Sequence, residues 1–283
     1  MKIAIIGAGT AGWSCAAALS KNKNLQIMLI SSKELNSIGV GESTLPMVRG
    51  FHQKFSLFFD NSWLKKANGT LKYTLEFEGF LENQNKKWFH PLSAYKKYEE
   101  YMCLKNIDKN NEYLANNFFY AQKLKNSSFH GIENYNLGIG AFHFDAKLYA
   151  NQLKQIALNR GVIHLEKTIK EVIQEKNITK KLILDDDSFI NAELFIDCSG
   201  FENILFKAFN NSFESFSNRL YCNSAVAIKV NYKDEKIQKT NATLSKALKN
   251  GWVWHIPLED KIAFGYVYSS SHITQEEAKK RVF

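Results

Sequence analysis

Residues 2–13 read KIAIIGAGTAGW, an apolar run that leads into a glycine-rich turn. The apolar run predicts a strand that is buried on both faces of a parallel sheet. In the G-x-G-x-x-G pattern, Gly7 permits a tight turn, Gly9 lets the backbone approach a diphosphate, and Gly12 allows a helix to pack closely. The N-terminus of that helix attracts the negative charge. A structural glycine turn without a ligand is the alternative interpretation.

A second strand is predicted at residues 25–30, LQIMLI, which gives the strand, helix and strand of a dinucleotide-binding unit. In such units the second strand usually ends in a carboxylate that binds the ribose hydroxyls. Here it ends in Ser31 and Ser32, with Glu34 as the nearest carboxylate. We therefore expect a serine hydroxyl or Glu34 to stand in for the usual acid.

The composition is that of a globular protein with a basic surface. The 283 residues are 45% hydrophobic and carry a formal net charge of +9. The excess is almost all lysine scattered along the chain, and arginine is limited to positions 49, 160, 219 and 281. This pattern favours a solvated basic surface over a nucleic-acid site, because few bidentate arginine forks are present.

The cysteines at positions 15, 103, 198 and 222 lie far apart and form no CxxC pair. This spacing predicts no metal site and favours a reducing compartment with free thiols. Three glycines interrupt the apolar N-terminus, which predicts a turn there and not a signal helix. No later run reaches membrane-spanning length. We expect a cytoplasmic protein without a membrane partner.

Residues 61–136 are aromatic, polar and irregular, with helical stretches such as 93–125, and have the character of an insertion. Regular patterning resumes after it, where Asp145 is placed to cap a helix and Gly161 to end it. Short alternating runs around the DDD turn at 185–187 then predict a small meander that returns to the main sheet.

Five short blocks occur in a fixed order along the chain: GAGTAGW (7–13), VGEST (40–44), FHFDA (142–146), LFIDCSG (194–200) and WVWHIP (252–257). Together they resemble the flavin-dependent halogenases typified by the tryptophan halogenases. The resemblance implies an α/β fold, with a Rossmann-like FAD-binding domain of the flavoprotein monooxygenase type and an inserted, discontinuous substrate domain. It assigns residues 1–60 and 141–215 to the FAD-binding domain, and residues 61–140 and 216–283 to a substrate or cap region.

The resemblance implies FAD as the cofactor. The residues that match FAD-binding positions are Gly7, Gly9, Thr10, Ala11, Gly12, Ser31, Gly41, Glu42, Ser43, Thr44 and Val172. The G-E-S-T loop resembles the mobile strap over the isoalloxazine ring, although its glycines are also compatible with a simple turn. Val172 matches a position whose backbone abuts the adenine, and ordinary strand packing is the alternative.

Lys72, in TLKYTLEFEG, matches the family's active-site lysine, whereas a lone lysine would otherwise be assigned to the surface. The resemblance implies that reduced FAD, supplied by a separate flavin reductase, reacts with oxygen to form a flavin hydroperoxide. That species oxidises chloride or another halide, and the hypohalous acid passes through a channel to Lys72. The lysine then holds the electrophile beside one carbon of an aromatic, indole- or pyrrole-like substrate.

Two further segments match parts of the family's active site. WFHPL resembles the stretch that places a histidine and a phenylalanine against the substrate, so His90 is expected to contact it. Leu92 stands where the phenylalanine is expected, which argues against free tryptophan as the substrate. Trp252, Trp254 and Pro257 match the block that separates flavin from substrate, and core packing of that strand is the bland alternative.

The remaining polar residues in these blocks have structural interpretations. Asp145 is explained as a helix cap, Asp197 as a residue that positions the strand end, and His143 as a locally packed side chain. The family's later block, which supplies an essential glutamate, has no counterpart in this sequence, so an incomplete or inactive chain is an open expectation. A flavin-dependent aromatic monooxygenase and a non-catalytic flavin-fold remnant are the alternative functions. A nicotinamide-linked dehydrogenase is disfavoured, because no paired acid and base is evident.

Overall fold

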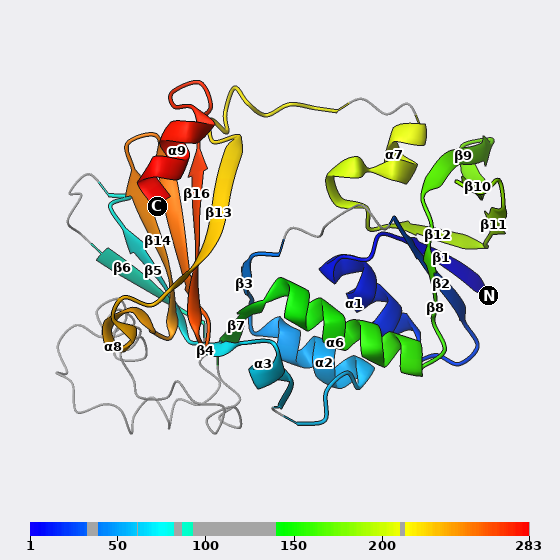
Figure 1. Ribbon diagram of the computed structural model, residues 1–283, viewed down its shortest axis with the longest axis horizontal. Coiled ribbons are helices and arrows are strands. Elements are labelled where there is room, and N and C mark those ends of the chain that lie inside the picture. The colour runs from blue at the N-terminus through cyan, green and yellow to red at the C-terminus, as the bar shows by residue number, and fades with distance from the viewer. Residues whose placement is uncertain (33–38, 61, 82–86, 93–139, 210–212, 283) are drawn as a thin grey trace, which may run out of the picture. The chain divides into compact units, whose positions relative to one another are not determined.

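The computed structural model describes residues 1–32, 39–60, 62–81, 87–92, 140–209 and 213–282 (Figure 1). Glu34, Cys103 and the helical stretch expected at 93–125 lie outside these ranges. The chain divides into two compact units, each built from three segments. The first unit comprises Met1–Gly39, Phe51–Trp63 and Ala146–Glu214, and the second comprises Val40–Gly50, Leu64–Asp145 and Ser215–Phe283.

The first unit is built on a four-stranded parallel sheet in the order β12-β1-β2-β8. Its strands are β1 (Lys2–Ile6), β2 (Gln26–Ser31), β8 (Ile163–Glu166) and β12 (Leu194–Asp197). Helices α1 (Thr10–Leu19) and α6 (Ala146–Asn159) lie side by side (Figure 1). The apolar run at 2–6 therefore forms the central strand that the sequence predicts.

A three-stranded antiparallel meander, ordered β11-β10-β9, completes the β structure of the first unit. Its strands are β9 (Ile169–Glu175), β10 (Ile178–Leu184) and β11 (Phe189–Asn191). The tight turn before β11 holds Asp187 at a φ of +62°. A short 3₁₀ turn, η2 (Gly200–Glu202), and helix α7 (Ile204–Ala208) follow β12. The meander around the DDD turn is thus confirmed.

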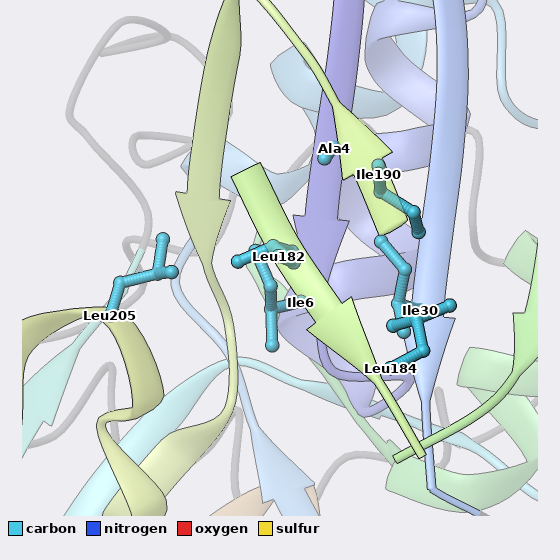
Figure 2. Packing of buried hydrophobic residues seen from close by; sticks show 7 residues of the cluster. All are labelled: Ala4, Ile6, Ile30, Leu182, Leu184, Ile190 and Leu205. Carbon is cyan, nitrogen blue, oxygen red and sulfur yellow. The ribbon is translucent and has the colours of Figure 1, made fainter. Parts of the chain in front are cut away.

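The core of the first unit lies between the parallel sheet and the meander. Leu182 and Leu184 of β10 point toward Ile6 of β1 and Ile30 of β2 (Figure 2). The other face of β1 is equally buried, because Ile3 and Ile5 alternate with the residues of this core. Burial on both faces explains why β1 is a continuous apolar run without polar alternation. The whole cluster comprises Ala4, Ile6, Ile30, Leu182, Leu184, Ile190 and Leu205.

The second unit contains a six-stranded sheet in the order β13-β16-β15-β14-β5-β6, in which only the β14–β5 pair is parallel. A smaller sheet, β3-β7-β4, is antiparallel throughout. The strands are β3 (Gly41–Ser43), β4 (Thr70–Lys72), β5 (Thr74–Glu78), β6 (Lys87–Pro91), β7 (Ala141–Asp145), β13 (Ser224–Asn231), β14 (Ala242–Leu248), β15 (Gly251–Pro257) and β16 (Lys261–Tyr268). Its helices are α8 (Glu235–Gln238) and α9 (Gln275–Val282), and α2 (Met47–Phe55) and α3 (Ser62–Lys66) each cross a unit boundary.

In the described ranges no helix has both the length and the apolar character needed to cross a membrane. The assignment of one unit to FAD and the other to substrate concerns binding, and it stays a prediction at this point. Its expected boundaries place residues 40–50 with the FAD-binding domain, whereas these residues group with the second unit.

Replacing Leu182 by alanine tests the core of the first unit. Leu182 is fully buried, so its loss should lower the free energy of unfolding by about 2–5 kcal/mol, as cavity-forming leucine substitutions do. Ile178, on the same strand, is 58% exposed, and its replacement by alanine should cost less than about 0.5 kcal/mol. Urea unfolding of both variants measures the difference. Equal effects would show that the meander does not pack on the parallel sheet.

Candidate functional site

The glycine turn of the first unit is sterically required at two positions. Gly7 has a φ of +105°, and a Cβ there would lie 2.2 Å from the carbonyl oxygen of Cys198. A Cβ on Gly12 would lie 1.9 Å from the carbonyl oxygen of Gly7. Gly7 thus lets β1 turn beside β12, and Gly12 lets α1 start against that turn.

Gly9 is different, because a Cβ there would meet no atom of the described chain within 4 Å. Its φ of −76° suits any residue, so backbone strain does not account for a glycine here. Gly9 is also the N-cap of α1, and having no side chain it makes no side-chain cap hydrogen bond at that helix end. An open approach to the positive end of a helix fits a diphosphate, which needs a side-chain-free backbone and N–H donors.

The end of β2 carries a hydroxyl that is already engaged. The Oγ of Ser31 lies 2.9 Å from Nε2 of His164 on β8. Burial and nearby Lys154 lower the pKa of His164 below its ordinary value, so the ring is neutral at neutral pH. Ser31 is therefore paired with a histidine, and its expected contact with the ribose stays a prediction. Val172 packs its side chain against the core of the first unit, and its contact with adenine stays a prediction.

The second unit has an unusually polar interior. Polar side chains on strands normally face water, and burying them is costly unless they are hydrogen-bonded. Here they extend inward from β4, β5, β7 and β14 and the residues next to them. The buried polar side chains are Thr70, Lys72, Thr74, Glu76, His143, Asp145, Asn241, Thr243 and Ser245. Such a concentration indicates a functional site more readily than a requirement of the fold.

Lys72 lies in this interior with its side chain pointing at the G-E-S-T loop. Only 2% of the residue is exposed, and its Nζ donates a hydrogen bond of 2.9 Å to the carbonyl oxygen of Thr44. Burial lowers the pKa of Lys72 from its ordinary 10.5 to about 8. The amine therefore has a neutral fraction of roughly a tenth at pH 7. A lone surface lysine, the alternative interpretation, is wrong for this residue.

The loop that receives Lys72 is fixed to β7. The N–H and the hydroxyl of Thr44 both donate to the carbonyl of Phe142, at 2.9 and 3.0 Å, and the Phe142 N–H donates back to that hydroxyl. Gly41 packs against β15 and β16, where a Cβ would lie 2.5 Å from that of Ala263. Burial raises the pKa of the Glu42 carboxyl. The loop is thus held on both sides, and it is more than a simple turn.

A chain of hydrogen bonds connects the same loop with the tryptophan block. The Oγ of Ser43 lies 2.6 Å from Oγ1 of Thr243, which lies 2.8 Å from Nε2 of His143. Nδ1 of His143 lies 3.1 Å from Oγ1 of Thr70, which donates to the Pro257 carbonyl at 2.8 Å. Nothing in the sequence singles out Thr70 or Thr243. Their only signal is a polar residue at a strand position, which is common on solvated strands.

Trp252 and Trp254 lie on the same face of β15, with ring centroids 6.1 Å apart at an angle of 57°. Trp254 covers Gly265, where a Cβ would lie 1.7 Å from the indole ring. Both indoles are half-buried, so the strand uses them for packing and still leaves part of each ring accessible. Packing of this strand is therefore confirmed, and its role as a barrier stays a prediction.

The expected substrate residues lie on and next to β6. His90 has an exposed side chain, while its carbonyl accepts a hydrogen bond of 2.9 Å from the Thr74 hydroxyl. Leu92 is buried, and its N–H donates to the carbonyl of Tyr73 at 2.9 Å. The backbone of Leu92 is thus hydrogen-bonded to Tyr73, the residue that follows Lys72. The backbone of His90 is bonded to Thr74 while its side chain is exposed, and contact of either residue with substrate stays a prediction.

The two aspartates of the family blocks have structural partners. Asp197 accepts hydrogen bonds from the Ser199 N–H at 3.0 Å and the Leu205 N–H at 2.8 Å, so it organises the turn and the start of α7. Asp145 ends β7 and forms a close ion pair with Lys229 of β13. Within the described ranges, no group of three or more His, Cys, Asp or Glu side chains could hold a metal ion.

Comparisons with known proteins give the same family throughout. The family model described as tryptophan halogenase matches residues 2–283. Tryptophan 7-halogenase RebH of Lentzea aerocolonigenes is 30% identical over 303 residues, which cover 98% of this chain and 57% of RebH. Tryptophan 6-halogenase ThaL of Streptomyces albogriseolus is 29% identical, with 98% and 57% covered.

Among solved structures, Tar14, a tryptophan C-6 flavin-dependent halogenase from taromycin biosynthesis, superposes with a TM-score of 0.83 at 26% identity. The superposition covers all of this chain and 59% of Tar14. The Rossmann-like α/β fold expected for a FAD-binding protein is therefore confirmed. The chain spans less than 60% of the length of these three relatives.

The pH dependence of stability tests the environment of Lys72. In the unfolded chain Lys72 keeps its proton up to about pH 10.5, whereas in the folded chain it releases it near pH 8. The free energy of unfolding of the wild type should therefore rise between pH 8 and 10.5 relative to a Lys72→Met variant, because the unfolded state binds more protons there. Urea titrations at several pH values measure this difference. A difference that stays constant from pH 7 to 11 would contradict the buried position.

Proposed function

The chain belongs to the tryptophan halogenase family, and on this premise we propose that it takes part in flavin-dependent halogenation of an aromatic compound. The first unit binds FAD, and the second unit holds the halogenating agent at Lys72. The observation that carries this proposal is the buried Lys72 amine, with its pKa near 8, hydrogen-bonded to the G-E-S-T loop. The activity as a whole is part of the proposal, because the chain spans less than 60% of its relatives.

The first unit supplies the cradle for the cofactor. Gly9 leaves the N-terminus of α1 open for the diphosphate, and the N–H groups of Thr10, Ala11 and Gly12 belong to the turn that begins there. Ser31, at the end of β2, is placed for the ribose, and the backbone of Val172 for the adenine. Bound FAD, reduced by a separate flavin reductase, would activate molecular oxygen, which is the oxidant that turns halide into hypohalous acid.

In this proposal Lys72 binds the hypohalous acid and transfers its halogen to the substrate. Its protonated amine donates a hydrogen bond to hypohalous acid, or its neutral form takes the halogen onto Nζ while the amine proton and the hydroxyl leave as water. Because both forms are populated near neutral pH, neither route requires a large shift in protonation. The amine then delivers the halogen to the nearest ring carbon, and the proton that this carbon loses returns to Nζ or passes to water, so that position and orientation decide the regiochemistry.

Residues on β15 separate the flavin from the substrate in this proposal, and residues on and next to β6 contact the substrate. Trp252 and Trp254 form a half-buried indole pair with limited rotational freedom, which suits a wall between flavin and substrate. Pro257 is the last residue of β15, and its carbonyl accepts a hydrogen bond from the Thr70 hydroxyl. His90 and Leu92 face the substrate, and the aliphatic Leu92 suits an indole- or pyrrole-like compound other than free tryptophan.

A non-catalytic flavin-fold remnant is the second candidate function. It is favoured by the pair of Ser31 with His164, which offers the ribose no carboxylate. A flavin-dependent aromatic monooxygenase is distinguished by a product that forms without halide.

A cytoplasmic location is also proposed, because Cys15, Cys198 and Cys222 are free thiols.

Substitutions of glycine test the cofactor site. A Gly9→Ala variant should fold with unchanged thermal stability, because its Cβ meets no neighbour, but it should bind FAD at least about tenfold more weakly. Gly50→Ala, in the helical α2, is the matched control, since its Cβ also meets no neighbour. Gly12→Ala should lose stability outright. Flavin absorbance after gel filtration measures binding, and retention of FAD by Gly9→Ala at the wild-type level would refute the cradle.

Replacing Lys72 by alanine tests the chemistry. The variant should retain FAD but form halogenated product at least about a hundredfold more slowly when supplied with reduced FAD, chloride or bromide, and an indole or pyrrole. Lys170→Ala removes an exposed lysine and should leave the rate unchanged. Mass spectrometry of the products follows the reaction. Unchanged halogenation by Lys72→Ala would overturn the lysine's role, and a wild type that takes up no FAD would favour the second candidate.

A further inference from the structure

The chain of hydrogen bonds from Ser43 to Pro257 has a direction that follows from its acceptor end. The carbonyl of Pro257 has no proton to give, so Thr70 must donate to it across 2.8 Å. Having used its only proton, the Thr70 hydroxyl accepts from Nδ1 of His143, which therefore carries the imidazole proton. One fixed carbonyl thus decides the tautomer of a histidine on the neighbouring strand.

The same reasoning continues on the other side of the ring. A neutral imidazole with its proton on Nδ1 has a bare Nε2, which accepts the proton of Thr243 across 2.8 Å. Thr243 can then only accept from Ser43, whose Oγ lies 2.6 Å away. The proton of Ser43 therefore points into the protein. The hydroxyl in the G-E-S-T loop has only lone pairs left for anything else that it contacts.

The order is stable because His143 stays neutral. The residue is fully buried, and burial together with the charges of Lys72 and His255 lowers its pKa well below the ordinary value. A second proton on the ring would make both nitrogens donors and would reverse the bond to Thr243. Since the ring does not take that proton near neutral pH, Ser43 keeps one role over the whole working range.

We propose that this chain makes Ser43 a fixed hydrogen-bond acceptor toward the flavin ring, and that the loop thereby favours reduced over oxidised flavin. The inference rests on the proposed function and on the family resemblance, which implies that the G-E-S-T loop lies over that ring. The N5 atom of an oxidised isoalloxazine is an acceptor, whereas the reduced ring carries a donor N–H there. A hydroxyl that can only accept a hydrogen bond therefore finds a donor at N5 of the reduced ring and none at N5 of the oxidised ring. Thr70, Thr243 and His143 are positioning residues, because they act through Ser43.

The tautomer of His143 is the first measurement, and it needs no cofactor. Nitrogen-15 NMR of histidine-labelled protein, with the signal assigned by its loss in His143→Gln, should show a protonated Nδ1 and a bare Nε2. Thr70→Val removes the hydroxyl and should move the proton to Nε2, while Thr70→Ser keeps the hydroxyl and should keep the wild-type tautomer. A proton on Nε2 in the wild type overturns the proposed order.

Flavin affinity is the second measurement, made by anaerobic titration of the full chain with FAD and with dithionite-reduced FAD. Ser43→Ala should weaken binding of reduced FAD about fivefold, the cost of one hydrogen bond, and leave oxidised FAD unchanged. Thr70→Val should lower the same preference, because Thr243 is then free to donate to Ser43, and Thr70→Ser should restore it.

The outcomes separate the two proposals. Equal weakening of both redox forms by Ser43→Ala overturns the preference and leaves the proposed function intact. A wild type that binds neither form overturns the proposed function and the flavin preference with it, whereas the NMR result still decides the order of the hydrogen bonds. Because Ser43 is only half-buried, its alanine variant tests the idea even where Thr70→Val fails to fold.

Discussion

An amine that is almost completely removed from water must find an acceptor inside the protein, and the second unit is arranged around that need. The acceptor of Lys72 is a backbone carbonyl, that of Thr44, and a carbonyl can be aimed only by fixing the backbone that carries it. The reciprocal bonds between Thr44 and Phe142 do this. Strand β7 is hydrogen-bonded to β3 on one side and β4 on the other, so it holds both the loop and the lysine.

The candidate site of the first unit depends instead on the absence of side chains, because glycine has no Cβ. Gly7 and Gly12 let three backbone segments meet where any Cβ would overlap a carbonyl. Gly9 makes no such contact with the described part of the chain, which agrees with the proposed approach of a diphosphate. Close packing at two positions and open space at a third thus create a helix end that is both rigid and accessible.

The sequence predicted those parts of the structure that depend on local pattern. The apolar run at 2–6 is β1, and the expected strand at 25–30 is β2 at Gln26–Ser31. The burial of Lys72 could be anticipated only through the resemblance, since nothing in TLKYTLEFEG distinguishes it from a surface lysine. Thr70, His143 and Thr243 could not be grouped at all. They lie 73 and 100 residues apart along the chain, and only strand pairing brings them together.

Electrostatics connects the lysine with the hydrogen-bonded chain beside it. The charge of Lys72 helps to keep the pKa of His143 low, so Lys72 and His143 do not both carry a positive charge near neutral pH. Burial is nevertheless the larger cause of that low pKa, and burial remains when Lys72 loses its proton or takes up a halogen. His143 therefore stays neutral through each state of the amine. The chemistry proposed at Lys72 would thus change its charge without reversing the hydrogen bonds that lead to Ser43.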